Sequence, residues 1–179
     1  TDLEGLRHVA AGLRADVFVF LTGSGTSEDV PGHLRTLATK MQVSADVGAD
    51  GLLKEALRID KHGTTIRALK DAGYFFAHPL SAPENMEDVD TGAFQLRDLS
   101  KCFHLVLERE VLRNSRYEYV VYTRPDYYWF TTLPDLEFLR QVNPQAVWIP
   151  DGCDSDGLND RMALIPRKWA AHYLDRWRL

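Results

Sequence analysis

A short segment of this chain combines residue types that bind phosphate groups and metal ions. Residues 119–126 read YVVYTRPD, so an apolar run stops at Arg124 and Asp126 follows two residues later. Pro125 has no backbone N–H for a strand ladder, and it keeps the residue before it extended. We therefore predict a strand that ends here and presents both charged side chains at the edge of a sheet, where open α/β folds bind ligands.

The two charged side chains suit different ligands. The guanidinium of Arg124 is shaped for bidentate contact with a phosphate. The carboxylate of Asp126 suits Mg²⁺ or Mn²⁺, hard ions that prefer oxygen ligands. The alternative is a local salt bridge between these two residues, which would have no role in chemistry.

A second charged cluster follows another apolar run, residues 146–149. Four acids within ten residues repel one another unless cations neutralise them; they are Asp151, Asp154, Asp156 and Asp160. The spacing does not fit an EF-hand, because Gly152 and Ala163 would occupy its first and twelfth positions. We expect both clusters to open onto one crevice at the same rim of the sheet, and a solvated acidic turn is the alternative.

Aromatic residues accompany both clusters. Tyr127 and Trp148 have flat apolar faces with polar edges, which suit stacking against a sugar ring or a base. For Trp148, which lies within a predicted strand, a place in the core is the stronger expectation. Residues 22–27 follow another predicted strand, but they lack the lysine of a P-loop. The six histidines show no metal-ligand spacing.

The pattern of apolar residues predicts the elements that position these groups. Strands are predicted over 16–22, 74–78, 117–123 and 146–149, and helices over 1–13, 52–59, 64–72, 94–107, 136–142 and 169–179, with a loop over 79–90. Alternation of strands and helices predicts an α/β fold with a mostly parallel central sheet flanked by helices. The helical pattern begins at the first residue, and the last helical pattern runs to Leu179 without a capping residue. We therefore expect residues 1–179 to be a single domain that continues at both ends.

Composition limits the possible partners. The 179 residues are 45% hydrophobic and 26% charged, which is typical of globular proteins. The net charge of −5 argues against nucleic acid, whose binding depends on clustered cations. No apolar run is long enough to cross a membrane. The sequence does not decide between the cytoplasm and, for a longer protein, the Golgi lumen.

Several segments together resemble a group of GT-A-type glycosyltransferase domains. They are the YVVYTRPD segment, residues 147–151, the segment NDRMALIPR at 159–167 and the helical pattern FQLxxLxxC at 94–102. In that group an Arg-x-Asp at a strand end stands where other members carry Asp-x-Asp. The resemblance covers residues 90–173 and implies a GT-A-like, Rossmann-related fold.

The resemblance also implies an activity, the transfer of a sugar from a nucleotide-diphosphate donor to a carbohydrate or other hydroxyl acceptor. Asp126 matches the acid that binds Mn²⁺ or Mg²⁺, and Arg124 stands where it could neutralise the leaving phosphate. Asp160 is the expected general base and Asp151 the second choice. Substrate contacts are expected from Arg124, Tyr127, Trp148, Asn159 and Arg161. A metal-dependent phosphohydrolase and a non-catalytic carbohydrate-binding or scaffold domain are the alternatives.

Overall fold

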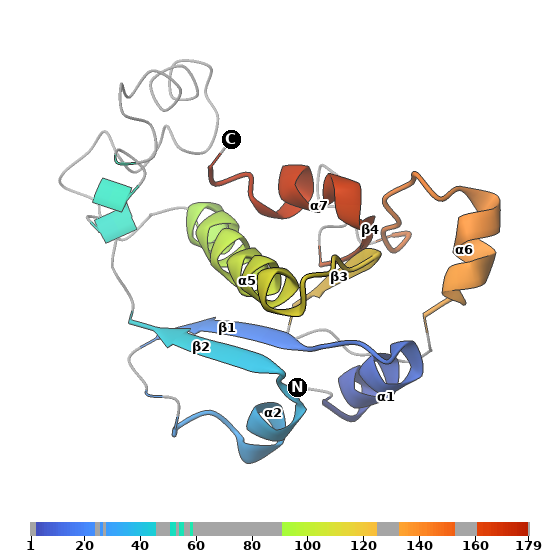
Figure 1. Cartoon of the computed structure of the whole chain (residues 1–179). Coiled ribbons are helices and arrows are strands. Elements are labelled where there is room, and N and C mark those ends of the chain that lie inside the picture. Colours follow the sequence, from blue (N-terminus) through green and yellow to red (C-terminus); the bar gives the residue numbers. More distant parts are fainter. Residues whose placement is uncertain are drawn as a thin grey trace.

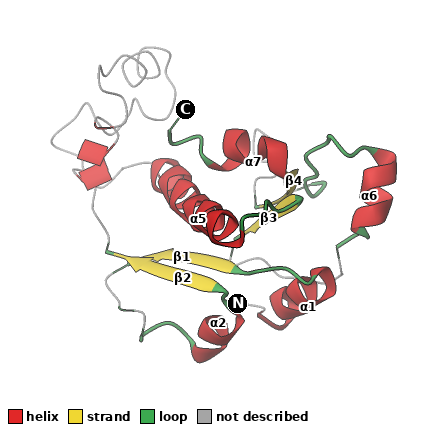
Figure 2. Ribbon diagram, viewed as in Figure 1, coloured by secondary structure: helices red, strands yellow, loops and turns green. Residues whose placement is uncertain are grey.

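One long helix, α5 (Thr91–Arg113), packs against two separate pairs of strands (Figures 1 and 2). The computed structural model describes residues 3–23, 26, 28–45, 51–52, 54–55, 58, 91–124, 133–152 and 161–178. The other elements are α1 (Leu3–Leu13), β1 (Phe18–Thr22), α2 (Gly32–Leu37), β2 (Lys40–Ser44), β3 (Tyr119–Thr123), α6 (Leu136–Val142), β4 (Met162–Pro166) and α7 (Arg167–Leu174).

The N-terminal part of the chain forms a parallel pair of strands. Phe18 of β1 pairs with Lys40 of β2, and the register continues to Thr22 and Ser44. Parallel strands need a crossover connection, and α2 lies within it. The two strands are therefore adjacent although 17 residues of sequence, 23–39, separate them.

Helix α5 contacts this pair on one side. The ring of Phe18 meets the ring of Tyr117 edge-on, with centroids 6.0 Å apart. Asp16 accepts hydrogen bonds from the hydroxyl of Tyr117 and from Arg113, the latter over 3.1 Å. The helix ends where Asn114 adopts φ 51°, a left-handed conformation that asparagine tolerates better than most residues. Polar and aromatic contacts thus join the end of α5 to the start of β1.

The other side of α5 packs against an antiparallel pair, β3 and β4. All five residues of β4 are buried. Side chains alternate between the two faces of a strand, and Ala163 and Ile165 face α5, where they pack with Phe103 and Val106. Helix α7 begins directly after β4 and adds Ala170 and Leu174 to the same core cluster. The main core therefore lies between α5, α7 and one face of the β3–β4 pair.

Helix α6 lies at the periphery of this arrangement (Figure 1). Its first turn is capped by Asp135, whose side chain accepts a hydrogen bond of 2.9 Å from the backbone of Glu137. Leu139 is buried, whereas the side chains of Phe138 and Val142 are exposed. Among the described helices, none has the length and apolarity to cross a bilayer.

The predicted mixed α/β class is confirmed, but the mostly parallel central sheet is not found. Among the described residues, one pair of strands is parallel and the other antiparallel, and the two pairs do not form one sheet. Apolar periodicity indicates which residues are buried, not which strands pair or in which direction. The predicted helix over 136–142 agrees with α6, whereas α7 ends at Leu174.

Other predicted elements have different outcomes. The predicted strand over 146–149 is present only as an isolated bridge at Trp148, and β2 and β4 were not predicted. Of the predicted helix over 52–59, residues 52, 54, 55 and 58 are helical. The elements predicted between residues 64 and 90 lie outside the described residues.

Candidate functional site

Two residues singled out from the sequence lie opposite one another at one end of the β3–β4 pair. Arg124 directly follows β3, and Arg161 directly precedes β4. The backbone N–H of Arg124 donates to the carbonyl oxygen of Arg161 over 3.1 Å. This bond continues the antiparallel ladder beyond its last pair, Thr123 and Met162. The first charged segment therefore begins, and the second ends, at adjacent strand positions.

Asp151 is held at the same end of the sheet by the segment that carries Trp148. The backbones of Trp148 and Leu164 exchange hydrogen bonds of 2.9 and 2.8 Å, and Leu164 also pairs with Val121 of β3. These three residues form a row across the strands, with β4 in the middle. Along the chain, Arg124 lies three residues after Val121, Arg161 three residues before Leu164, and Asp151 three residues after Trp148. All three lie on the same side of the row, and we call them the charged edge.

The order of strands at this edge differs from the prediction. The sequence predicted residues 117–123 and 146–149 as strands of a mostly parallel sheet, with the charged clusters after them at one rim. The two segments do run in the same direction, but β4 lies between them and is antiparallel to both. Adjacent strands are about 4.8 Å apart, so the backbones of Val121 and Trp148, on either side of Leu164, are separated by roughly 10 Å. A ligand that contacts both flanking segments must therefore extend across β4.

Four predicted site residues lie outside the described residues: Asp126, Tyr127, Asn159 and Asp160. In the sequence Asp126 is two positions from Arg124, and Asp160 immediately precedes Arg161. Within the described ranges, no group of three His, Cys, Asp or Glu side chains is arranged to hold a metal ion. Asp151 and Arg161 are exposed and Arg124 is half-buried, so the charged edge is accessible from solvent.

Trp148 lies on the row described above and not on the charged edge. It is half-buried, and its neighbours Val147 and Ile149 pack against the core cluster on the opposite face of the segment. Its indole Nε1 is buried without a hydrogen-bond partner in the described structure. The backbone pairing of Trp148 therefore gives it a clear part in positioning Asp151, and substrate stacking by its ring stays a prediction.

A buried ion pair fixes the opposite end of β4. Arg167 donates two hydrogen bonds of 2.7 Å to the carboxylate of Glu110 on α5, and its guanidinium lies over the ring of Phe103, 5.3 Å from the centroid. Burial raises the pKa of Glu110, but hydrogen bonds from Arg167 and from the backbone of Tyr117 outweigh it and hold the pKa below its ordinary value. Only 7% of Glu110 is exposed, so this pair has a structural role.

A serine and a histidine one turn apart on α5, Ser100 and His104, meet a distant aspartate, Asp175, at the end of α7. Ser100 donates to Asp175, and Nε2 of His104 lies 3.5 Å from the other oxygen of that carboxylate. In a nucleophilic triad the histidine contacts the serine, whereas here the aspartate lies between them. Only 1% of Ser100 is exposed. The group therefore links two helices and is not a nucleophilic site.

The carboxyl end of β1 holds another charged group. Thr22 donates to Asp98 over 2.8 Å, and the buried guanidinium of Arg97 contacts both Asp98 and Glu55, over 3.1 and 2.8 Å. Lys101 also pairs with Glu55. Thr22 opens the segment 22–27 that the sequence suggested only weakly as a phosphate loop, and its hydroxyl is already used to tie β1 to α5. Residues 24, 25 and 27 lie outside the described residues.

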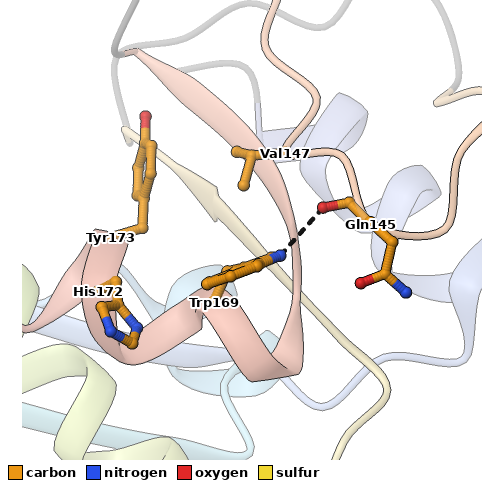
Figure 3. A pocket seen from close by; sticks show the side chains of 5 residues that line it. All are labelled: Gln145, Val147, Trp169, His172 and Tyr173. Atoms are coloured by element: carbon orange, nitrogen blue, oxygen red, sulfur yellow. Dashed lines mark hydrogen bonds between the residues drawn. The ribbon is translucent and has the colours of Figure 1, made fainter.

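A surface depression that the sequence did not predict lies beside α7 (Figure 3). We call it the aromatic groove; its volume is about 380 Å³, and it is lined by Gln145, Val147, Trp169, His172 and Tyr173. The indole N–H of Trp169 donates to the backbone carbonyl of Gln145 over 3.0 Å, which fixes the ring. The aromatic repeat at positions 169, 173 and 177 was a visible signal, but we interpreted it only as a helix.

A family profile matches the C-terminal part of the chain. A profile described as "Domain of unknown function (DUF7796)" matches residues 81–179, more than half of the chain. The chain belongs to this family. In this DUF7796 protein the matched region contains α5, both strands of the antiparallel pair, the charged edge and the aromatic groove. Neither the curated proteins nor the solved structures include a match to the chain.

Proposed function

We propose that this DUF7796 protein transfers a sugar from a nucleotide-diphosphate donor to a hydroxyl acceptor at the charged edge. The GT-A-like, Rossmann-related fold implied by the sequence resemblance is part of the proposal. The observation that carries it is the hydrogen bond from Arg124 to Arg161. It joins two of the segments that carry the resemblance to glycosyltransferases, although the two residues are 37 positions apart in sequence.

The charge of the edge supports a phosphate-bearing ligand. Two of its three residues are arginines, on an otherwise acidic chain of net charge −5. Guanidinium groups bind phosphate oxygens in a fixed bidentate geometry. In the proposed reaction Arg124 and Arg161 bind the diphosphate and stabilise the negative charge that develops on it as it leaves.

The acids at this edge supply the remaining chemistry in the proposal. The acceptor oxygen forms a bond to the anomeric carbon while the bond from that carbon to the diphosphate oxygen breaks, and Asp160 takes the proton of the acceptor hydroxyl. Asp151 is the alternative base. Tyr127, Trp148 and Asn159 contact the substrates. Asp126 would hold Mn²⁺ or Mg²⁺, which would add positive charge next to the diphosphate.

Binding of the donor product is the first test. We expect UDP or GDP at millimolar concentration to raise the melting temperature of the full chain. Measurements with and without Mn²⁺ give the contribution of the metal. Arg124→Ala and Asp126→Ala should reduce the shift. Arg35→Ala is the matched control, because this exposed arginine lies on α2, away from the charged edge, and it should leave the shift unchanged.

The same assay separates the alternatives. Absence of a shift with both nucleotides, or a shift that persists in Arg124→Ala and Asp126→Ala, would overturn the proposal. Release of inorganic phosphate from simple phosphate esters, with no acceptor present, would indicate a phosphohydrolase instead. Binding of carbohydrate that is unaffected by Asp126→Ala and Asp160→Ala, without nucleotide binding, would indicate a non-catalytic carbohydrate-binding domain.

A further inference from the structure

The aromatic groove has the form of a binding site for a ring-shaped ligand. In Figure 3 the indole ring of Trp169 lies below the gap that separates Tyr173 from Val147. Trp169 is 42% exposed although its N–H is held by the backbone of Gln145. The volume of the groove, about 380 Å³, lies within the range of ligand pockets. A rigid, exposed aromatic ring flanked by a second aromatic and an apolar wall suits the C–H face of a sugar ring.

The groove is also bordered by cations. The ammonium of Lys168 lies 4.9 Å from the ring centroid of Trp169, and the guanidinium of Arg176 lies 5.2 Å from that of Tyr173. Within the described structure neither cation forms a salt bridge, whereas Arg167, next to Lys168, is neutralised by Glu110. The ring of His172 meets Trp169 edge-on, with centroids 5.8 Å apart. Arg176 also donates from Nε to the backbone carbonyl of Tyr173 over 2.9 Å, which fixes it beside the groove. Positive charge that no described carboxylate neutralises, on a chain of net charge −5, favours an anionic ligand.

We propose that the aromatic groove binds an acidic saccharide, with a sugar ring on Trp169 and a carboxylate or sulfate group near Lys168 and Arg176. The site is separate from the charged edge. The lining residues of the groove include none of the three residues of the charged edge. Binding in the groove therefore does not require sugar transfer, and it would also occur in a protein that lacks this activity.

NMR of the four indole N–H groups of the full chain tests the proposal. The signal of Trp169 is assigned from its loss in Trp169→Phe. Trigalacturonic acid should shift this signal in a saturable manner, and its fully methyl-esterified form, which has the same rings without charge, should bind at least threefold more weakly. Isothermal titration calorimetry measures the same binding in variants that lack the Trp169 signal. By this measurement we expect Trp169→Ala to weaken binding about tenfold and Lys168→Gln to abolish the preference for the acid over its ester.

Two controls keep the result specific. Phe138→Ala removes an exposed aromatic side chain on α6, outside the groove, and should leave binding unchanged. Arg124→Ala should also leave it unchanged, and Trp169→Ala should preserve any nucleotide-induced rise in melting temperature, so the two sites can fail independently. Equal binding of acid and ester, binding of UDP in preference to the saccharide, or absence of a shift at millimolar acid would overturn the proposal.

Discussion

Glu110 and Arg167 join α5 to the end of β4 through two parallel hydrogen bonds of 2.7 Å. The side chains of these residues are 7% and 16% exposed, so water screens the pair only weakly. The backbone N–H of Arg167 also donates to the carbonyl of Glu118, just before β3. The pair thus fixes the end of the antiparallel strands opposite to the charged edge.

Removal of the negative charge in this pair should destabilise the protein. Glu110→Gln leaves Arg167 largely buried without its counter-charge, and we expect the free energy of unfolding to fall by about 3 kcal/mol. Urea denaturation measures the change. Glu108→Gln is the matched control on the same helix, because Glu108 is exposed and pairs with Lys40 at the surface; its cost should stay below about 1 kcal/mol. Equal costs for the two variants would contradict this assignment.

The lowered pKa of two acids predicts how stability depends on pH. The pKa of Glu110 lies below its ordinary value of 4.5 for the reasons given above. The pKa of Asp16 is lowered first by the hydrogen bond from Tyr117 and further by Arg109 and Arg113. A carboxyl group with a lowered pKa in the folded state contributes stability above its ordinary pKa, and this contribution is lost as the pH falls through the lowered value.

We therefore expect the free energy of unfolding to decrease as the pH falls below about 4.5. The decrease should be smaller in Glu110→Gln, because glutamine does not titrate. Urea denaturation at about pH 7, about pH 4.5 and about pH 3.5 gives the free energy of unfolding of both proteins at each pH. Parallel pH profiles of the two proteins would show that Glu110 does not contribute.

Two leucines on α5 provide a matched test of the core. Leu105 is 2% exposed and Leu112 is 76% exposed. Leu105→Ala should reduce the free energy of unfolding by roughly 2–5 kcal/mol, because it leaves a cavity, whereas Leu112→Ala should change it by less than about 0.5 kcal/mol. Thermal or urea denaturation measures both. A large loss in Leu112→Ala would mean that another part of the chain covers this end of α5.

Cys102 is half-buried and its Sγ lies 3.8 Å from the backbone carbonyl oxygen of Phe18, so its thiol should react slowly in the folded protein. Burial raises the pKa of its thiol from 9.0 to about 11, and the thiolate is the form that reacts. Alkylation by iodoacetamide at pH 8, followed by mass spectrometry of the peptide that contains Cys102, should be at least about a hundredfold slower in the native protein than in urea. Similar rates in both conditions would contradict the buried position of this thiol.

The helices were largely predictable from local sequence, but the pairing of the strands was not. Helix α6 begins after a capping residue, Asp135, and α5 carries a long apolar face, so both patterns are local. Strand β4 has an uninterrupted apolar sequence, MALIP, and a buried strand was a possible interpretation. The predicted strands nevertheless do not include this segment. Its position between β3 and Trp148 depends on contacts between distant residues.

The candidate site was predictable to a similar extent. The apolar runs that stop before Arg124 and Asp151 indicated charged residues at strand ends, and both residues follow segments that end on the same side of the sheet. The adjacency of Arg124 and Arg161 required knowledge that β3 and β4 are antiparallel. The aromatic groove could not be inferred from α7 alone, because Val147 and Gln145 come from another segment.

The contacts of α5 with β1 also bear on the limits of an autonomous folding unit. Strand β1 lies upstream of residues 81–179, which match the family, yet Thr22 and Asp16 bind Asp98 and Arg113 of the helix, and Phe18 packs against its core. A peptide restricted to the matched residues would expose this flank of α5 to water and would be prone to aggregation. We therefore expect a stable fold to require the upstream strands, and expect the folded unit to extend beyond the matched residues.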